Sequence, residues 1–214
     1  MGIFGKCSAS VNKERKTKYE RKSKETEERI SLNVDGSGKS DIATTIGFLD
    51  HMLTLFSYHG YFDLDIKAKG DTHVDKHHLN EDIGIALGDA FKQALGDSKG
   101  INRTASAEVP MDTVSAKVVV DLSNRFAFVF NDHRPAGTVE IKDDEGFSMH
   151  YAKDFLESMA KRLSMNLHVT IYGDGGDMHH YLEAVFKAFG IALDKATAID
   201  PRRAGEVPSS KGIL

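Results

Sequence analysis

The motif His-His-x-x-Glu occurs twice in the sequence, and this repetition constrains the fold more than any other feature. Both copies stand at the head of a segment in which apolar residues recur at helical spacing, so each predicts the first turn of an amphipathic helix. The first His and the Glu of a copy are four residues apart, which places them on one face of that helix. The motif residues are His77, His78 and Glu81 in the first copy and His179, His180 and Glu183 in the second.

The segments that precede the two motifs also match. Residues 48–60 predict a helix that ends at a glycine, and residues 62–68 alternate as a half-buried strand. In the second half, residues 151–163 and 167–172 predict a helix and a strand in the same order. This agreement indicates an internally duplicated α+β fold, with the boundary between its halves near residues 97–100.

The register of the duplication can be tested within the sequence. Asp65 and His168 occupy matching positions in the two strands, and counting fourteen residues back from each gives His51 and Asp154. The same alignment brings the two His-His-x-x-Glu motifs together with one gap. Asp154 is therefore expected to be the counterpart of His51.

Further strands are expected ahead of these helices. The basic run at residues 13–24 is interpreted as the solvated face of a strand, and residues 30–34 alternate as a second strand before a turn. In the second half, residues 114–122 and 126–130 predict two neighbouring strands with a turn at Asn124-Arg125. Residues 132–148 are polar and predict a loop or an extended hairpin. Each half thus reads as strand, strand, helix, strand, helix.

Composition narrows the classes of function. The chain has 214 residues, of which 40% are hydrophobic, with a formal net charge of −4. This size supports a substantial core, and the charge argues against a general affinity for nucleic acid or a membrane surface. One cysteine, Cys7, excludes an intramolecular disulfide. No apolar signal core or membrane-length apolar run is evident, so we expect a cytoplasmic protein.

The two motifs supply the ligand types of a transition-metal site, which are imidazole and carboxylate. Adjacent helical residues point about 100° apart, so the two histidines of one motif are expected to serve two different ions. With the duplication as a guide, one predicted ion is held by His77, Glu81, His180 and Asp154. The second is held by His78, His179, Glu183 and His51.

Several segments together resemble the imidazoleglycerol-phosphate dehydratase family. They are Gly47-Phe48-Leu49-Asp50-His51-Met52-Leu53, Asp75-x-His77-His78-x-x-Glu81-Asp82, Ile83-Gly84-Ile85-Ala86-Leu87-Gly88, His179-His180-x-x-Glu183-Ala184-x-Phe186-Lys187-Ala188-Phe189 and Val207-Pro208-Ser209-Ser210-Lys211-Gly212. The resemblance extends from about Lys18 to the C-terminus. It implies two βαβ-type halves, each with a four-stranded sheet packed on two helices.

The resemblance also implies a reaction. The family are carbon–oxygen lyases that dehydrate imidazole glycerol phosphate to imidazole acetol phosphate in histidine biosynthesis. They use two Mn²⁺ ions per active site and form a homo-oligomer of 24 subunits with active sites between neighbours. Cations at the ring nitrogens favour an imidazolate that expels hydroxide, and a carboxylate then removes a proton from the neighbouring carbon.

Roles follow for particular residues by the same resemblance. Glu25 is the expected acid/base, and Glu81 and Glu183 are counted with it as catalytic. His59 is expected to contact the substrate, and its phosphate is expected to meet Arg103, Arg125, Ser209, Ser210 and Lys211. The expected organisation is an N-terminal extension at 1–17, halves at 18–97 and 98–200, and a tail at 201–214 that contributes to the phosphate site.

The sequence departs from the family pattern in places. Lys76 stands where an acidic residue is usual, and the segment from Arg134 to His150 is longer than usual. Asp154 occupies a position that is often His or Glu, which leaves open whether Asp154 or His150 completes the metal site.

Two other classes of function remain open on the residues alone. A dinuclear metal hydrolase acting on phosphate esters needs similar ligands. A non-catalytic metal-binding or RNA-binding module using the basic run at residues 13–24 would leave Arg103, Arg125 and Lys211 without a shared ligand.

Overall fold

The computed structural model describes residues 14–135, 146–173, 177–203 and 205–212. Two four-stranded sheets and four long helices account for most of these residues. The first half contains β1 (Lys16–Lys22), β2 (Thr26–Asn33), β3 (Ser40–Ala43), α1 (Gly47–His59), β4 (Asp63–Gly70) and α2 (Lys76–Leu95). The second contains β5 (Thr104–Met111), β6 (Val114–Asp121), β7 (Ala127–His133), α3 (Met149–Leu163), β8 (Asn166–Gly173) and α4 (Met178–Thr197), and a short 3-10 helix follows at Pro201–Arg203.

The two sheets have the same topology. Their strand orders are β1-β2-β4-β3 and β5-β6-β8-β7. In each sheet the first three strands of this order pair antiparallel, and the last pair is parallel because a helix crosses over between its strands. Thus β3-α1-β4 and β7-α3-β8 are the βαβ units that the resemblance implied.

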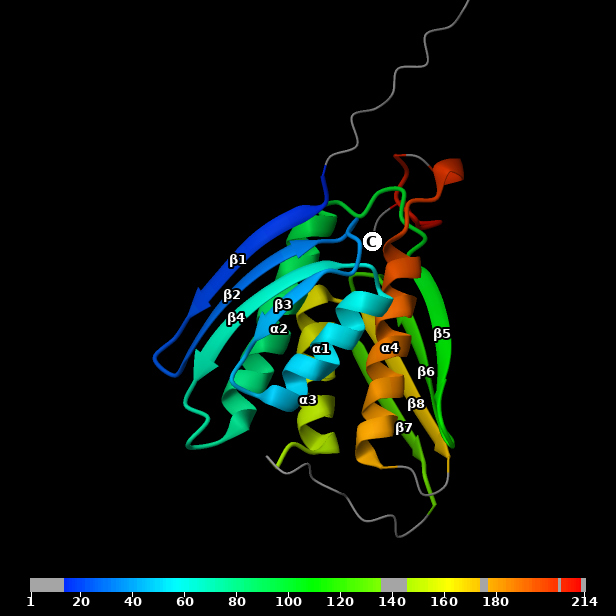
Figure 1. Ribbon diagram of the computed structural model, residues 1–214. Coiled ribbons are helices and arrows are strands. Elements are labelled where there is room, and N and C mark those ends of the chain that lie inside the picture. Colours follow the sequence, from blue (N-terminus) through cyan, green and yellow to red (C-terminus); the bar gives the residue numbers. More distant parts are fainter. Residues whose placement is uncertain (1–13, 136–145, 174–176, 204, 213–214) are drawn as a thin grey trace, which may run out of the picture.

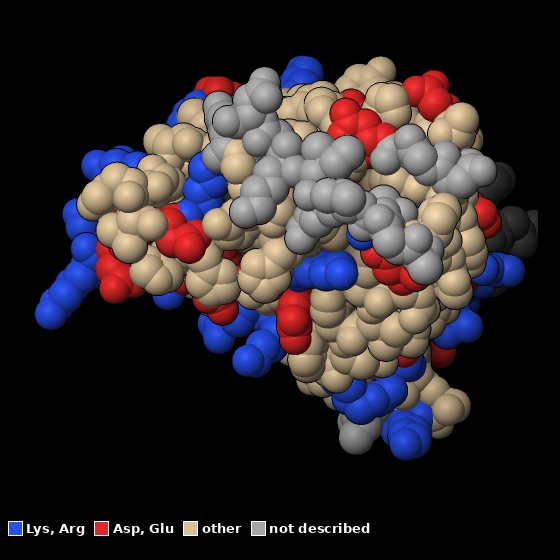
Figure 2. Space-filling model, turned by 90° about the horizontal axis from the view of Figure 1, so that it is seen from below, with Lys and Arg blue, Asp and Glu red and all other residues tan. Residues whose placement is uncertain are grey.

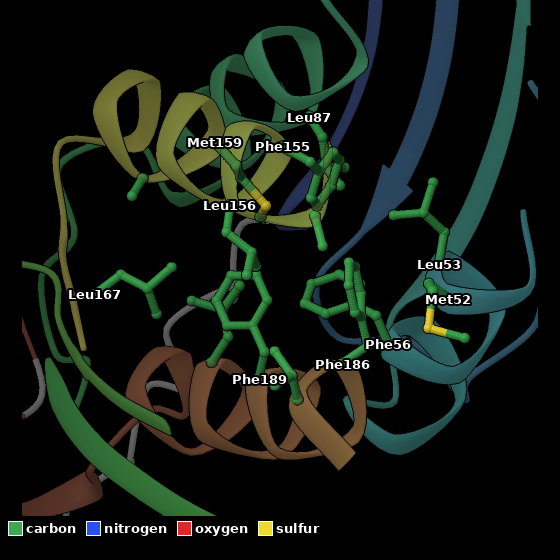
Figure 3. Packing of buried hydrophobic residues seen from close by; sticks show 14 of the residues in the cluster. Met52, Leu53, Phe56, Leu87, Phe155, Leu156, Met159, Leu167, Phe186 and Phe189 are labelled. Carbon is green, nitrogen blue, oxygen red and sulfur yellow. The ribbon is translucent and has the colours of Figure 1, made fainter. Parts of the chain in front are cut away.

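The helices lie between the two sheets and join the halves. Figure 1 shows the first sheet and the second on opposite sides of a central layer formed by the four helices. Within this layer α2 of the first half packs on α3 of the second, and α1 packs on α4. Phe56 of α1 lies 5.1 Å from Phe189 of α4 between ring centroids, and both belong to one continuous hydrophobic core (Figure 3). The halves therefore share a core.

Small residues allow the close approach of these helix pairs. A methyl group added at Gly88 of α2 would lie 2.7 Å from the carbonyl oxygen of Met159 in α3. A methyl group added at Gly190 of α4 would lie even closer to the carbonyl oxygen of Phe56 in α1. Contacts this short exclude a side chain, so glycine is required at both interfaces.

The internal register deduced from the sequence is confirmed in the strands. Asp65 pairs with Ser31 and Asp41, and His168 pairs with Val119 and Val129 in the equivalent places of the second sheet. Both helices that carry the His-His-x-x-Glu motifs span twenty residues and begin after an aspartate cap. The duplication extends from the strand pairing to the capping residues.

Two strands were not predicted individually, namely β3 and β5. Both lie at an edge of their sheet, where one side of the strand pairs with no other strand of the described residues. β3 is only four residues long, and β5 consists largely of small or polar residues and includes Pro110. Because an edge strand buries less surface, its sequence carries a weaker alternation of apolar residues.

The expected pairing of residues 114–122 with 126–130 is wrong. β6 lies between β5 and β8, and β7 instead runs parallel to β8 at the far edge. The chain reverses near Asn124, which has a positive φ of 57°, but it enters a crossover rather than a hairpin. β7 also continues to His133, within the segment expected to be a loop.

Helix α3 begins two residues earlier than predicted, at Met149. His150 consequently belongs to the helix that carries Asp154. At the N-terminus, β1 begins at Lys16, two residues before the expected start of the first half. Cys7 and most of the expected N-terminal extension lie outside the described residues, as do residues 136–145 of the expected loop and residues 174–176 between β8 and α4.

None of the helices in the described residues combines the length and apolar character needed to cross a membrane.

Candidate metal centres and phosphate site

The first cluster of metal-ligand types lies between α2 and α3. His77 Nδ1 is 3.1 Å from Asp154 Oδ2, and His150 Nε2 is 3.3 Å from the same oxygen. Their ligand atoms all lie within 4.8 Å of one another. Glu81 is also near, with its Oε2 3.6 Å from His77 Nε2, on the other nitrogen of the imidazole ring. The structure thus brings together three of the four residues predicted for one ion and adds His150.

The second cluster lies between α1 and α4. Glu183 Oε1 is 2.9 Å from His51 Nε2 and 3.1 Å from His179 Nε2. These three residues are three of the four predicted for the second ion, and their ligand atoms also fall within 4.8 Å. Both clusters arise because a helix of one half packs on a helix of the other.

The carboxylate of Glu183 is held ionised by its neighbours. Burial alone raises the pKa of this group, but hydrogen bonds from Lys187 and His51 outweigh burial and lower the pKa from 4.5 to about 2. Lys187 Nζ lies 2.6 Å from Glu183 Oε2, one helical turn further along α4. An ionised carboxylate beside two imidazoles is the form that binds a cation.

The second histidine of each motif faces a different group of residues. His78 Nδ1 lies 3.1 Å from Asp71 Oδ2 and 4.0 Å from Glu25 Oε2. The hydrogen bond with Asp71 raises the pKa of His78 above its usual range. Glu25, the expected acid/base, is therefore placed beside a histidine of the predicted metal site by the turn between β1 and β2.

His180 has an equivalent environment in the second half. Its Nδ1 lies 3.5 Å from Asp112 Oδ2, and Asp112 is in the turn between β5 and β6. His180 is not gathered with His77, and His78 is not gathered with His179. In the described part of one chain, the two predicted four-ligand sets are therefore each incomplete by one histidine.

The predicted phosphate residues lie at the opposite end of the molecule. Arg103 donates hydrogen bonds to Asp121, with Nε 2.6 Å from Oδ1, and to the carbonyl oxygen of Pro208 at 3.0 Å. The first of these contacts raises the pKa of Arg103. Pro208 leads directly into Ser209, Ser210 and Lys211, so Arg103 and this part of the tail are brought together.

Arg125 and His59 are placed separately. Arg125 is exposed before β7, where its carbonyl oxygen accepts a hydrogen bond from Asn166 at the start of β8. His59 is the last residue of α1 and is half-buried. Burial lowers the pKa of His59, and the charge of Lys187 adds to this effect.

The length of α4 separates the two kinds of residue. His179 is in its first turn, whereas the backbone N–H of Arg103 bonds to the carbonyl oxygen of Ala196 in its last turn. Seventeen helical residues span about 25 Å. Figure 1 shows the same arrangement, with the helices beginning at the lower end and the C-terminal tail at the upper end.

Four residues beside the predicted site were not identified from the sequence, and all four are charged side chains. Lys187 contacts Glu183, and Asp71 and Asp112 contact the second histidines. Asp82 receives hydrogen bonds from Thr26 and Arg21, both at 2.6 Å, which tie the turn that carries Glu25 to α2. The duplication offered a usable signal for Asp112, since Glu25 and Asp112 both occupy the first hairpin turn of their half.

The face seen in Figure 2 is the end at which the four helices begin. In its described part, Lys and Arg side chains are interspersed with Asp and Glu side chains. The basic run on β1 is likewise partnered, since Arg21 contacts Asp82 and Lys22 contacts Glu27. These pairs fit the interpretation of the run as an ordinary strand face.

The fold and the clusters together define a duplicated α+β protein with two centres of metal-binding composition between its helices, beside a third group formed by Glu25, Asp71 and His78. Two imidazoles and a carboxylate in each centre fit a divalent transition metal. A family model of imidazoleglycerol-phosphate dehydratase matches residues 44–193. The chain belongs to the imidazoleglycerol-phosphate dehydratase family.

Individual relatives support the same assignment over nearly the whole chain. The dehydratase of Geobacillus kaustophilus is 53% identical over 194 residues, covering 91% of this chain and 96% of the relative. That of Bacillus subtilis is 50% identical over 200 residues, covering 94% and 100%. The crystal structure of the Staphylococcus aureus dehydratase has a TM-score of 0.73 at 34% identity, covering 86% of this chain and 100% of that chain. This chain is accordingly a hydro-lyase for the dehydration step of histidine biosynthesis.

Proposed function

We propose that the chain dehydrates imidazole glycerol phosphate with two Mn²⁺ ions per active site. The His77–Asp154 cluster would hold one ion and the His51–His179–Glu183 cluster the other. His78 and His180 of neighbouring subunits would complete the two centres. When bound, the ions supply positive charge at the ring nitrogens of the substrate and so stabilise its imidazolate form.

The residues of the chain have separate tasks in this scheme. Lys187 and His51 keep Glu183 ionised, so this carboxylate is ready to bind a cation at neutral pH. Glu25 is the base that removes the proton from the carbon next to the one losing hydroxide. Its position is fixed by the hydrogen bond from Thr26, the adjacent residue, to Asp82 on α2.

The separation of the two ends of α4 is the observation that carries the proposal. A substrate with an imidazole ring at one end and a phosphate at the other cannot reach both His179 and Arg103 of one chain across about 25 Å. One active site would therefore combine the metal-binding residues of one subunit with the phosphate-binding residues of another. This need supports a homo-oligomer with active sites between subunits, for which 24 copies are the expectation from the family.

We further infer that the protein works in the cytoplasm, without nucleic-acid or membrane partners. The single cysteine and the net charge of −4 support this inference.

The test is an assay of imidazole acetol phosphate, detected by the ultraviolet absorbance of its enolate in alkali. Chelator-stripped protein is compared with and without added Mn²⁺, and the variants His78→Ala and His180→Ala are measured beside His73→Ala, an exposed histidine outside the clusters. Wild type and His73→Ala are expected to form product when Mn²⁺ is added and not without it. His78→Ala and His180→Ala are expected to form no product under either condition. Product formation by stripped protein, or by both other variants at wild-type rates, would overturn the proposal.

A further inference from the structure

We propose that His150 is a metal ligand, so that the centre between α2 and α3 is formed by His77, His150 and Asp154. The inference rests on the proposed metal centres and assigns a residue that the family motifs do not include. It also answers the question that the sequence left open, because His150 and Asp154 act together instead of competing for one position.

The first support is the position of His150 on α3. Because α3 begins at Met149, His150 and Asp154 are one helical turn apart on the same face. His150 Nε2 and His77 Nδ1 approach the same atom, Asp154 Oδ2, at 3.3 and 3.1 Å. Donor atoms that bind one ion at about 2.1 Å are typically separated by about 3 to 3.5 Å. Each imidazole therefore already has the spacing of a co-ligand from Asp154, and all three ligand atoms lie within 4.8 Å of one another.

The second support is the composition of the two centres. The α1/α4 centre contains a lone histidine from α1, His51, and a histidine and a carboxylate one turn apart on α4. With His150, the α2/α3 centre has the same composition, with the lone histidine on α2 and the one-turn pair on α3. Without His150, the described part of one chain would offer this ion a single imidazole. His150 thus gives the two centres the same ligand composition, whereas the duplication itself relates His51 to Asp154 and the His179–Glu183 pair to the His77–Glu81 pair.

The third support is the orientation of the rings. The imidazoles of His77 and His150 are nearly parallel, with an interplanar angle of 7° and a centroid separation of 6.5 Å. They stand side by side over Asp154, whose side chain is only 18% exposed. A surface ion pair between His150 and Asp154 would account for one contact. It would not account for the parallel alignment of His77 on the same carboxylate oxygen.

Nitrogen ligands also affect the choice of metal. Imidazole favours the later transition metals, whereas carboxylate and water favour Mg²⁺ and Mn²⁺. Loss of one imidazole is therefore expected to weaken Mn²⁺ binding more than Mg²⁺ binding. Selection of Mn²⁺ over Mg²⁺ at the α2/α3 centre would depend on His150.

The experiment measures Mn²⁺ binding to the full, assembled chain by the electron paramagnetic resonance signal of free Mn²⁺. His150→Phe retains a ring beside His77 but removes both nitrogens. Asp154→Ala removes another proposed ligand of the same centre and serves as the reference for its loss. His168→Ala, an exposed histidine of β8 outside both clusters, is the control. In His150→Phe and Asp154→Ala, one of two ions is expected to bind on the order of 10 to 100 times more weakly. The other ion should bind as in wild type.

Folding is followed by thermal unfolding of the chelator-treated proteins. His150 is 70% exposed, so His150→Phe is expected to unfold at the wild-type temperature without metal and to gain less from added Mn²⁺. Two ions bound with wild-type affinity by His150→Phe would overturn the inference while leaving the proposed function intact. Two tightly bound ions in wild type without dehydratase activity would instead contradict the proposed function and leave the ligand assignment standing. If His150→Phe unfolds at a lower temperature than wild type even without metal, the test uses the Co²⁺ absorption bands of His150→Gln, with His168→Ala as the control. Bands that are shifted in His150→Gln but not in His168→Ala support the inference. Bands that are unchanged in His150→Gln overturn it.

Discussion

Asp75 caps the helix that carries His77, because its carboxylate accepts a hydrogen bond from the backbone N–H of His77 at 2.8 Å. The same contact recurs in the second half, where Asp177 accepts from the backbone N–H of His179 at 3.1 Å. Each cap satisfies a backbone donor at the start of a helix whose first turn holds the metal-ligand types. The position of each histidine is therefore fixed by the residue two places before it.

Removal of either cap should lower stability by a similar amount. Asp75→Ala and Asp177→Ala are each expected to reduce the free energy of unfolding by about 1 kcal/mol, because a helix loses its side-chain cap. Asp75→Asn and Asp177→Asn retain a capping oxygen and should lose markedly less. Urea unfolding of the four metal-free variants measures the difference. Equal losses for the Ala and Asn variants would show that the caps do not act through this hydrogen bond.

The close helix contacts predict two separable effects on the metal centres. Gly88→Ala should move α2 away from α3 and lower stability by about 1 to 3 kcal/mol through overpacking. Gly190→Ala should do the same between α4 and α1. Each variant should weaken one Mn²⁺ site and spare the other, as measured by metal binding after refolding. Loss of the same site in both variants would contradict the assignment of one centre to each helix pair.

Glu28 predicts an unusual dependence of stability on pH. Its side chain is fully buried on β2, and neither carboxylate oxygen has a hydrogen-bond partner within the part of the chain that the structure describes, although Arg21 Nη1 lies 3.6 Å away. Burial raises the pKa of Glu28 above its ordinary 4.5. The folded state therefore binds the proton more tightly than the unfolded state, and this contribution to stability is complete below the unfolded pKa and is lost as pH rises through the folded pKa.

The variant Glu28→Gln tests this sign. It should remove the loss of stability that wild type shows as pH rises from about 4.5, so that its advantage over wild type grows toward neutral pH. Denaturant unfolding at several pH values gives the comparison, with Glu20→Gln on the exposed side of β1 as the control. A wild-type profile that runs parallel to that of Glu28→Gln would refute the prediction.

A site shared between subunits predicts complementation. His179→Ala damages a metal centre and Arg125→Ala damages the phosphate side, and each homogeneous protein should be nearly inactive. Co-expressed as mixed oligomers, the two variants should recover activity, because some sites then combine the intact parts of both chains. Mixed oligomers, purified with two affinity tags, are assayed for imidazole acetol phosphate. If both sides of the site came from one chain, mixing would restore nothing.

The sequence determined the features that depend on neighbours along the chain. Helical periodicity placed His77 with Glu81 and His179 with Glu183, each pair at the start of a helix that the structure confirms. The duplication was visible because both halves keep the same spacing between strand and motif. Edge strands such as β3 were missed because they bury too little surface to impose a pattern.

Only the tertiary structure decided which ligands meet. α2 packs on α3, and α1 on α4, because glycines permit contacts between segments that are far apart in the sequence. This packing joins His77 to Asp154 and adds His150, which the sequence left as an alternative. Among the described residues, it also places His78 with Glu25 and Asp71 and leaves His180 outside the groups of metal-ligand types. Residue types and local spacing determine which ligand residues each helix carries. The close packing of helices that are distant in the sequence determines which of these ligands lie together.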